Sequence, residues 1–212
     1  MYKIVRKRAL NDSVTLMEVQ APHIAKKAKA GQFIIFRVDE QGERVPLTIA
    51  DYDREAGTVT IIYQIVGAST KLLNTLEEGD SILDFVGPLG VPTHIDPNAK
   101  RVCVIGGGVG TAIAYPQAKA LHNAGIAVDM IAGFRSKDIV ILEDEMKAVT
   151  DHLYIMTDDG TYGEKGLVTN KLQALIDAGE QYDEVIAIGP VIMMKFVAAT
   201  TKPYGIKTLV SL

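Results

Sequence analysis

The stretch from Val104 to Ala112 reads VIGGGVGTA, and it decides the fold class. It continues a short apolar run typical of a buried strand, and it leads into a helix-length segment. Glycine lets the backbone come close to a pyrophosphate, and the free amides at the start of a helix attract anions. The stretch therefore predicts a strand–turn–helix unit that binds a dinucleotide through Gly106, Gly107, Gly108, Gly110 and Thr111. A tight turn without a ligand is the alternative, since Thr111 stands in place of the third glycine of G-x-G-x-x-G.

The residues after this stretch alternate between apolar runs and helix-length segments. Apolar runs at 102–105, 126–132 and 185–188 are separated by helical patterns that include 114–124 and 169–178. Strands that are buried on both faces form unbroken apolar runs, and their alternation with helices is typical of βαβ units. The second half is therefore predicted to be an α/β domain with a parallel sheet.

The residues before the glycine stretch have a different pattern. Short β-branched or aromatic runs at 14–19, 32–38, 58–65 and 81–86 predict a small antiparallel β-barrel or sandwich. One helix is expected among them, from Lys71 to Leu76, with Ser69 or Thr70 as its cap. A segment rich in proline and glycine, 87–100, separates the halves. We therefore expect a β-barrel domain over 1–98 and an α/β domain over 99–212.

Composition excludes several classes of protein. The formal net charge of −4 argues against a nucleic-acid partner. No run approaches the roughly 18 apolar residues that a membrane-spanning helix needs, so no membrane partner is expected. The single cysteine, Cys103, excludes an internal disulfide and favours a reducing compartment, so we expect a cytoplasmic protein. The four histidines lack the spacing of metal ligands, and no metal site is predicted.

The choice of coenzyme depends on the end of the second strand of the α/β domain. Sites for NAD usually carry an acidic residue there, which binds the ribose hydroxyls. Asp129 lies inside the strand rather than at its end, so we do not assign it this role. Arg135 and Lys137 follow the strand and are either ligands of the 2′-phosphate of NADP or solvated loop cations. The chemistry slightly favours NADP and leaves NAD open.

Seven segments spread along the chain resemble the ferredoxin–NADP reductase superfamily. In order they are AGQFIIFRV (30–38), RVPLTIADYD (44–53), VGASTKLL (66–73), GPLG (87–90), VIGGGVGTAIAYPQAKAL (104–121), TDDGTYGEKG (157–166) and IGPVIMMK (188–195). Within the superfamily the chain is most similar to electron-transfer subunits of the dihydroorotate dehydrogenase type and to the small, FAD-containing subunit of NADH-dependent ferredoxin–NADP oxidoreductase, also called sulfide dehydrogenase. The resemblance implies FAD in the first domain and NAD(P)H in the second.

The same resemblance implies the residues of the flavin site. Pro46, Leu47 and Thr48 match the strand that contacts the flavin, and Thr48 matches a hydroxyl residue beside the reactive edge of the ring, which makes it the one candidate catalytic residue. Many relatives carry an arginine at the position of Val45, and Arg44, one step earlier, is the candidate substitute. Leu47 stands where plant-type members have an aromatic residue that stacks on the flavin. The FAD pyrophosphate is expected at Gly67, Ser69 and Thr70, for which a plain capped helix is the alternative.

In the second domain the resemblance points to two further segments. Gly189 and Pro190 follow the strand 185–188, and this strand end lies near the nicotinamide in the family; proline suits the first turn of the helix expected there. Ile188 stands where many relatives have a cysteine. Asp159 belongs to a turn signal, Asp158-Asp159-Gly160, and is either a coenzyme contact or a turn residue.

These observations predict a flavin-dependent oxidoreductase that passes hydride from NAD(P)H to FAD and electrons onward to a partner subunit or iron–sulfur centre. Two alternatives remain. One is an NAD(P)-dependent dehydrogenase without flavin, and the other is a non-catalytic subunit that binds a nucleotide. The resemblance implies a larger oxidoreductase subunit as partner, in a heterodimer, with ferredoxin or a similar carrier as a further possibility.

The family also carries a [2Fe–2S] cluster in a segment that follows the last strand. This chain ends in an apolar run, 206–212, and contains only Cys103 as a thiol ligand. Clusters of this kind are held by four cysteine thiolates. We therefore expect no [2Fe–2S] cluster in these 212 residues.

Overall fold

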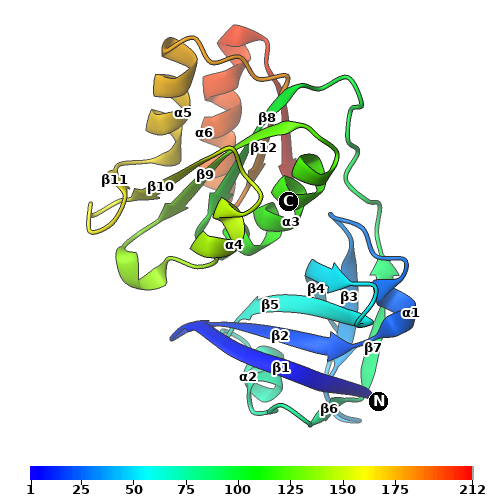
Figure 1. Ribbon diagram of the computed structural model, residues 1–212. Coiled ribbons are helices and arrows are strands. Elements are labelled where there is room, and N and C mark those ends of the chain that lie inside the picture. The colour runs from blue at the N-terminus through cyan, green and yellow to red at the C-terminus, as the bar shows by residue number, and fades with distance from the viewer. Residues whose placement is uncertain (212) are drawn as a thin grey trace. The chain divides into compact units, whose positions relative to one another are not determined.

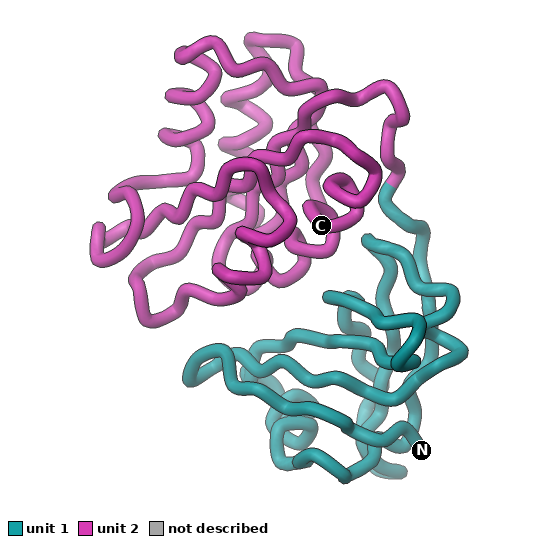
Figure 2. Tube along the Cα trace, in the orientation of Figure 1, with its two compact units in different colours: residues 1–93 teal, residues 94–212 magenta. Residues whose placement is uncertain are grey.

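The computed structural model describes residues 1–211. Leu212, the last residue of the predicted terminal run, lies outside the described part. The chain divides into two units, Met1–Thr93 and His94–Leu212 (Figure 2). This division falls inside the segment rich in proline and glycine, a few residues before the expected boundary at 98.

Unit 1 contains seven strands that form one antiparallel sheet (Figure 1). They are β1 (Tyr2–Asn11), β2 (Val14–Gln20), β3 (Phe33–Arg37), β4 (Val45–Asp53), β5 (Thr58–Gln64), β6 (Ser81–Ile82) and β7 (Asp84–Leu89), in the spatial order β6-β1-β2-β5-β4-β3-β7. The two edge strands, β6 and β7, are separated in the chain only by Leu83. The two edges of the sheet must therefore meet, and the sheet curls into a nearly closed barrel. The predicted antiparallel barrel is confirmed.

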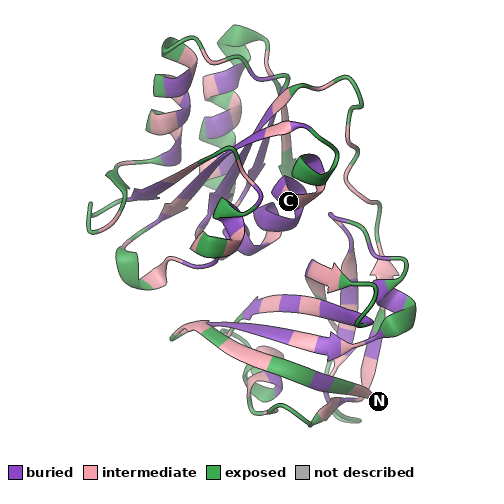
Figure 3. Cartoon of the chain, viewed as in Figure 1, coloured by how far each residue is buried: buried purple, intermediate pink, exposed green. Residues whose placement is uncertain are grey.

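The interior of the barrel follows from the alternation of side chains along each strand. In β3, Ile34 and Phe36 are fully buried, whereas Phe33, Ile35 and Arg37 are only partly buried. Two helices, α1 (Pro22–Ala25) and α2 (Ala68–Asn74), complete the unit. Figure 3 shows the alternation as bands of buried and exposed colour along the barrel strands.

Unit 2 is a parallel sheet with helices on both faces. The strands are β8 (Arg101–Gly107), β9 (Ala127–Phe134), β10 (His152–Thr157), β11 (Glu164–Lys165), β12 (Glu184–Ile188) and β13 (Lys207–Ser211), in the order β11-β10-β9-β8-β12-β13. Of the helices, α5 (Val168–Asp177) and α6 (Val191–Thr201) pack on one face, and α3 (Thr111–Asn123) and α4 (Glu143–Lys147) lie on the other (Figure 1). The predicted α/β domain with its parallel sheet is confirmed.

The order of the strands fixes where a ligand can bind. The chain runs outward from β8 through β9 and β10, and then returns past β8 to form β12 on its other side. In open sheets of this kind ligands bind outside the carboxyl ends of the strands, at the point where the direction of winding reverses. In unit 2 that point lies between β8 and β12.

Three helix starts differ from the sequence expectation. Helix α3 begins at Thr111 instead of Ala114, because a 3-10 turn, Gly108–Gly110, leads directly into it. Helix α2 begins at Ala68 with Gly67 as its cap, so neither Ser69 nor Thr70 is the capping residue. Helix α6 begins at Val191, and Pro190 is its cap rather than a residue of its first turn. In α2 and α3 the helix starts before the expected residue, at a turn that begins with a glycine, whereas α6 starts one residue after the expected proline.

Candidate functional site

Two loops meet at the point in unit 2 where the winding reverses. They follow β8 and β12, and they are neighbours because Ile188 pairs with Gly106 in the parallel ladder. A Cβ atom on Gly107 would lie 2.5 Å from the sulfur of Met193, and one on Gly110 would lie 2.7 Å from the carbonyl oxygen of Ile188. A Cβ atom on Gly189 would lie 2.8 Å from the Met193 methyl carbon. These glycines are therefore required for the close packing of the two loops.

Gly108 differs from the other glycines of the loop. Its φ is +56°, a backbone conformation that favours glycine, and a Cβ atom there would meet nothing within 4 Å among residues 1–211. The space beside it is open, at the start of the 3-10 turn that leads into α3. The loop thus leaves room for a ligand at Gly108, next to backbone amides at a helix start that attract an anion.

The first residue of α3 adds a second feature of a ligand site. Thr111 is fully buried, and within residues 1–211 its hydroxyl oxygen has no hydrogen-bond partner. Buried polar atoms are almost always paired, so an orphaned one calls for an explanation. Thr111 also lies against Gly106, whose Cβ atom would come within 2.8 Å of it. The threonine in place of a third glycine is therefore packed into the loop.

The loops after β9 and β10 lie at the same carboxyl edge of the sheet. The Arg135 side chain is exposed, and within residues 1–211 its guanidinium forms no hydrogen bond or ion pair. Lys137 instead places its ammonium 5.3 Å from the centre of the Tyr162 ring. The Asp159 carboxylate accepts hydrogen bonds from the hydroxyl and the amide of Thr161, and these bonds lower the pKa of Asp159. Of the two predicted cations, Arg135 is the one without a partner in the described chain.

In unit 1 the candidate flavin strand, β4, presents two different faces. Val45 and Leu47 pack against the barrel core, so Pro46 and Thr48 point outward. The leucine that the sequence placed among the cofactor contacts therefore turns its side chain into the barrel.

Arg44 shares the outer face with Thr48. Arg37 points outward from β3 and binds Asp84 at 2.7 Å, and Arg44 reaches the same carboxylate at 3.3 Å. An arginine at position 45 would share the face of Leu47 and the barrel core. The one-residue offset thus keeps the Arg44 guanidinium on the face of Thr48.

The start of α2 offers one free hydroxyl rather than two. The Thr70 hydroxyl accepts hydrogen bonds from the amides of Val66 and Gly67 at 3.2 and 3.1 Å, and it donates to the Gly67 carbonyl. Thr70 therefore closes the first turn of the helix. Ser69 is partly exposed, and a Cβ atom on Gly67 would meet nothing within 4 Å. The side of α2 that can receive an anion is formed by Gly67 and Ser69.

The other end of α2 is held to the barrel by buried polar contacts. The side-chain oxygen of Asn74, the last residue of α2, accepts hydrogen bonds from Thr15 at 2.9 Å and from Tyr63 at 3.2 Å. Tyr63 is buried, and this burial raises the pKa of its hydroxyl above the ordinary value. These contacts fix the position of α2, and thus of Ser69, relative to β2 and β5.

Known proteins that resemble the whole chain point to one family. A protein of Thermotoga maritima, named as a homologue of the electron transfer subunit of dihydroorotate dehydrogenase B (NAD(+)), is 42% identical over 99% of this chain and 73% of its own length. The chain belongs to the family of dihydroorotate dehydrogenase B electron transfer subunits. The subunit of Bacillus pumilus is 34% identical over 91% of this chain and 74% of its own length. No protein-family model matches the chain.

A solved structure supports the same assignment. The structure of an NADH-dependent reduced ferredoxin–NADP oxidoreductase, described for flavin-based electron bifurcation, matches with a TM-score of 0.92 and 40% identity, over 100% of this chain and 76% of that one. A cytochrome P450 reductase from Amycolatopsis matches at a TM-score of 0.78 and 18% identity, over 99% of this chain and 68% of that one, which shows a shared fold alone. This member of the electron transfer subunit family is therefore an oxidoreductase subunit with the ferredoxin reductase-like fold.

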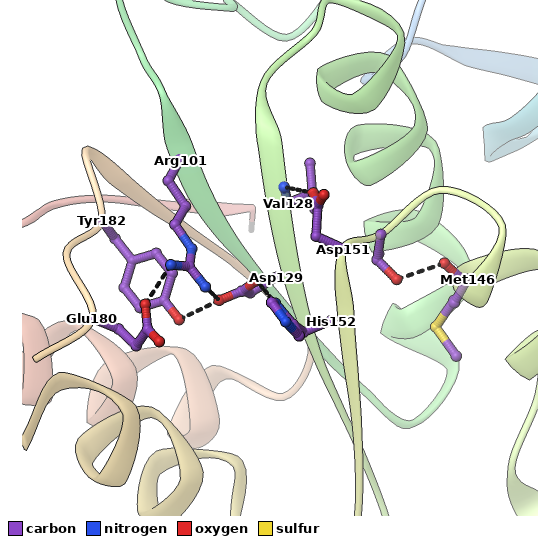
Figure 4. A network of polar contacts seen from close by, with 9 residues as sticks. Arg101, Val128, Asp129, Met146, Asp151, His152, Glu180 and Tyr182 are labelled. Carbon is purple, nitrogen blue, oxygen red and sulfur yellow. Dashed lines mark hydrogen bonds and ion pairs between the residues drawn. The ribbon is translucent and has the colours of Figure 1, made fainter. Parts of the chain in front are cut away.

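One buried polar cluster of this family member was not predicted from the sequence. Asp129 is fully buried and accepts hydrogen bonds from Arg101 at 2.7 Å, Tyr182 at 2.6 Å and His152 at 2.9 Å, and Arg101 also pairs with Glu180 (Figure 4). Asp129 is the third residue of β9, so it lies toward the end of the strand opposite the glycine loops. A lone aspartate within an apolar run was the only signal in the sequence. The cluster joins β8, β9 and β10 to the segment before β12, at the edge of the sheet opposite the glycine loops.

Three further features were searched for in the described chain: a reactive thiol, a metal site and a membrane-spanning helix. Cys103 is fully buried in β8, and burial raises the pKa of its thiol, so it is an inert core residue. No three His, Cys, Asp or Glu side chains within residues 1–211 come together as a metal site. In the same part of the chain, no helix has the length and apolar character that crossing a membrane requires.

Proposed function

We propose that the chain is an FAD-dependent subunit that oxidises NAD(P)H and passes the electrons to a larger partner subunit. The observation that carries the proposal is the pair of loops at the winding reversal of unit 2, with open space at Gly108 and the orphaned hydroxyl of Thr111. A dinucleotide pyrophosphate fits both features, because its oxygens accept hydrogen bonds from amides and hydroxyls at a helix start. Membership of an electron-transfer family supports the redox role.

The fit of FAD to unit 1 rests on the outer face of β4 and the start of α2. Thr48 offers a hydroxyl on this face, and Arg44 offers a cation beside it. Gly67 and Ser69 offer open backbone and one free hydroxyl for a pyrophosphate. When bound, FAD would supply the exchange between two-electron and one-electron chemistry. The chain's own residues would orient the flavin ring, donate hydrogen bonds to it and exclude water.

The nicotinamide half of the coenzyme is assigned to the loop after β12. Gly189 and Pro190 follow directly on Ile188, whose backbone pairs with Gly106. The absence of a thiol at position 188 means that no cysteine can take part in proton or electron transfer there. Binding and orientation are therefore the main contributions of this loop.

The adenosine half is assigned to the loop after β9, and the choice between NAD and NADP depends on Arg135. Its unpaired guanidinium suits a 2′-phosphate, whereas the name of the Thermotoga maritima relative refers to NAD(+) and that of the similar solved structure refers to both NADH and NADP. Replacement of Arg135 by alanine distinguishes the two. A loss for NADPH much larger than for NADH assigns the guanidinium to the 2′-phosphate. Equal losses would make Arg135 a general nucleotide contact and leave NADH, which the relatives' names include, as the better choice.

The partner is assigned from the same relatives. Electron transfer subunits act within larger oxidoreductases, so we propose a heterodimer with a larger subunit, from which ferredoxin or a similar carrier can receive electrons. The chain itself contains one cysteine, which is buried in β8, so we propose that these 212 residues hold no [2Fe–2S] cluster.

The decisive experiment is an absorption spectrum of the purified chain followed by an anaerobic titration with NADH. The proposal expects a yellow protein whose flavin bands disappear on reduction. A colourless protein that oxidises a small alcohol or acid with NAD(P) would favour a dehydrogenase without flavin. A colourless protein that binds a nucleotide but reduces no acceptor would favour a non-catalytic subunit.

A further inference from the structure

The loops that follow β9 and β10 are tied together beyond the ends of the strands. The amide of Asp158 donates to the carbonyl of Phe134 at 3.0 Å, and the amide of Asp159 donates to the carbonyl of Arg135 at 3.2 Å. One more bond holds the next part of the loop, because the amide of Lys137 donates to the hydroxyl oxygen of Thr161 at 2.9 Å. The backbone on both sides of Arg135 is therefore held by the 158–161 loop.

The Thr161 hydroxyl is oriented by a second hydrogen bond, in which it is the donor. It donates that proton to Asp159 Oδ1 at 2.7 Å, and the Thr161 amide donates to the same oxygen at 2.9 Å. A hydroxyl has one proton and two lone pairs, so the bond to Asp159 turns a lone pair toward the Lys137 amide. The bonds from Thr161 are also the leading cause of the lowered pKa of Asp159.

The Lys137 side chain is held by a separate contact. Its ammonium lies 5.3 Å from the centre of the Tyr162 ring, and the Tyr162 hydroxyl donates to Glu143 at 2.9 Å. Glu143 in turn pairs with Lys147 at 2.6 Å. Lys137 is thus turned toward α4, which leaves Arg135 as the cation of this loop that is free to bind a ligand.

We propose that Asp159 and Thr161 are positioning residues that fix the 135–137 loop, and with it Arg135, for the adenosine half of the coenzyme. In this inference, which rests on the proposed function, Asp159 acts through Thr161 and does not touch the coenzyme. The TDDGTYGEKG segment (157–166) then has a defined part in coenzyme binding, because residues 158–161 hold the 135–137 loop in place through hydrogen bonds.

The test compares a ligand that has the adenosine half with one that lacks it. The variants Asp159→Ala and Thr161→Val remove the hydrogen bonds, and Asp159→Asn and Thr161→Ser are matched controls that keep an acceptor or a hydroxyl. Calorimetry measures the binding of ADP-ribose to the purified full chain. Stopped-flow absorption measures anaerobic flavin reduction by the dinucleotide and by reduced nicotinamide mononucleotide.

We expect Asp159→Ala and Thr161→Val to raise the dissociation constant of ADP-ribose and of the dinucleotide about tenfold or more, because each change removes hydrogen bonds worth about a factor of five to ten. The limiting rate of flavin reduction should not change, nor should the rate with the mononucleotide. Asp159→Asn and Thr161→Ser should resemble the wild type in every measurement.

Three results would overturn the inference. The first is an unchanged affinity for ADP-ribose in Asp159→Ala. The second is an equal loss for dinucleotide and mononucleotide, since that would indicate a general disturbance of the unit. The third is an Asp159→Asn variant as weak as Asp159→Ala, since that would make the charge and not the hydrogen bond the cause. If the wild type binds ADP-ribose but its flavin is not reduced, the proposed function fails. The calorimetric comparison of the variants with ADP-ribose still tests the inference.

Discussion

The sulfur of Met193 on α6 lies so close to Gly107 that a Cβ atom there would be 2.5 Å from it. This contact joins the last residue of β8 to the helix after β12, so the glycine serves the packing of two segments that are distant in the chain. Gly108, the next residue, has no such neighbour within 4 Å. The two adjacent glycines therefore have different roles, and mutation can separate them.

The first prediction compares Gly107→Ala with Gly108→Ala. Gly107→Ala should lower the free energy of unfolding by about 1–3 kcal/mol because of overpacking, and Met193→Ala in the same chain should recover part of the loss. Gly108→Ala should lower the free energy of unfolding by about 1–2 kcal/mol, because alanine is strained in a left-handed backbone conformation. It should also weaken NAD(P)H binding more than the double variant Gly107→Ala with Met193→Ala does. Urea unfolding measures the effects on stability, and coenzyme titration measures the effects on binding. Identical behaviour of the two single variants would contradict this division of roles.

The second prediction separates Ser69 from Thr70 at the start of α2. Ser69→Ala should weaken FAD binding by about 1.5–3 kcal/mol, the value of a hydrogen bond to a charged group, with little change in stability. Thr70→Ala should destabilise unit 1 by about 1 kcal/mol because Val66 and Gly67 lose their acceptor. Flavin release followed by fluorescence and urea unfolding measure the two effects. A Thr70→Ser variant is the control, since it keeps the hydroxyl; a loss of stability in it would show that the methyl group matters instead.

The third prediction concerns the pH dependence of stability through Tyr182. Burial, and then the hydrogen bond to Asp129, raise the pKa of this tyrosine above the ordinary value. Because the folded pKa is the higher one, the folded state retains a proton that the unfolded state releases, so stability should fall as the pH rises above about 10. Tyr182→Phe should lower stability at neutral pH and flatten this decline. The burial of Tyr63 also raises its pKa, so part of the decline should remain in the variant.

The fourth prediction concerns the metal content of the purified chain. With Cys103 as its one thiol, the chain should contain no stoichiometric iron or acid-labile sulfide after anaerobic reconstitution with iron and sulfide. Its flavin should still be reduced by NAD(P)H. Iron and sulfide in a ratio of one cluster per chain would contradict the prediction, and Cys103→Ala would then show whether this thiol is a ligand.

Local patterns in the sequence predicted the architecture well because the relevant information lies in contiguous residues. The unbroken apolar run before Gly106 and the helix-length segment after Thr111 specify a strand–turn–helix unit without reference to other parts of the chain. The alternation in 58–65 similarly specifies a strand with one buried face, which became β5. The helix starts were less well predicted, because a glycine or proline can begin the turn one to three residues before the first good helix former.

The sequence by itself therefore determined the two-part architecture, the family resemblance and the segments where ligands are expected. Only the tertiary structure decided which of their side chains are available. Ile188 and Gly106 are neighbours because of the strand order, and Arg44 is on the face of Thr48 because Val45 and Leu47 enter the barrel. The partners of Asp129 come from three distant segments. The reason is physical: local propensity depends on neighbours along the chain, whereas burial and hydrogen-bond partners depend on residues that folding brings together from far apart.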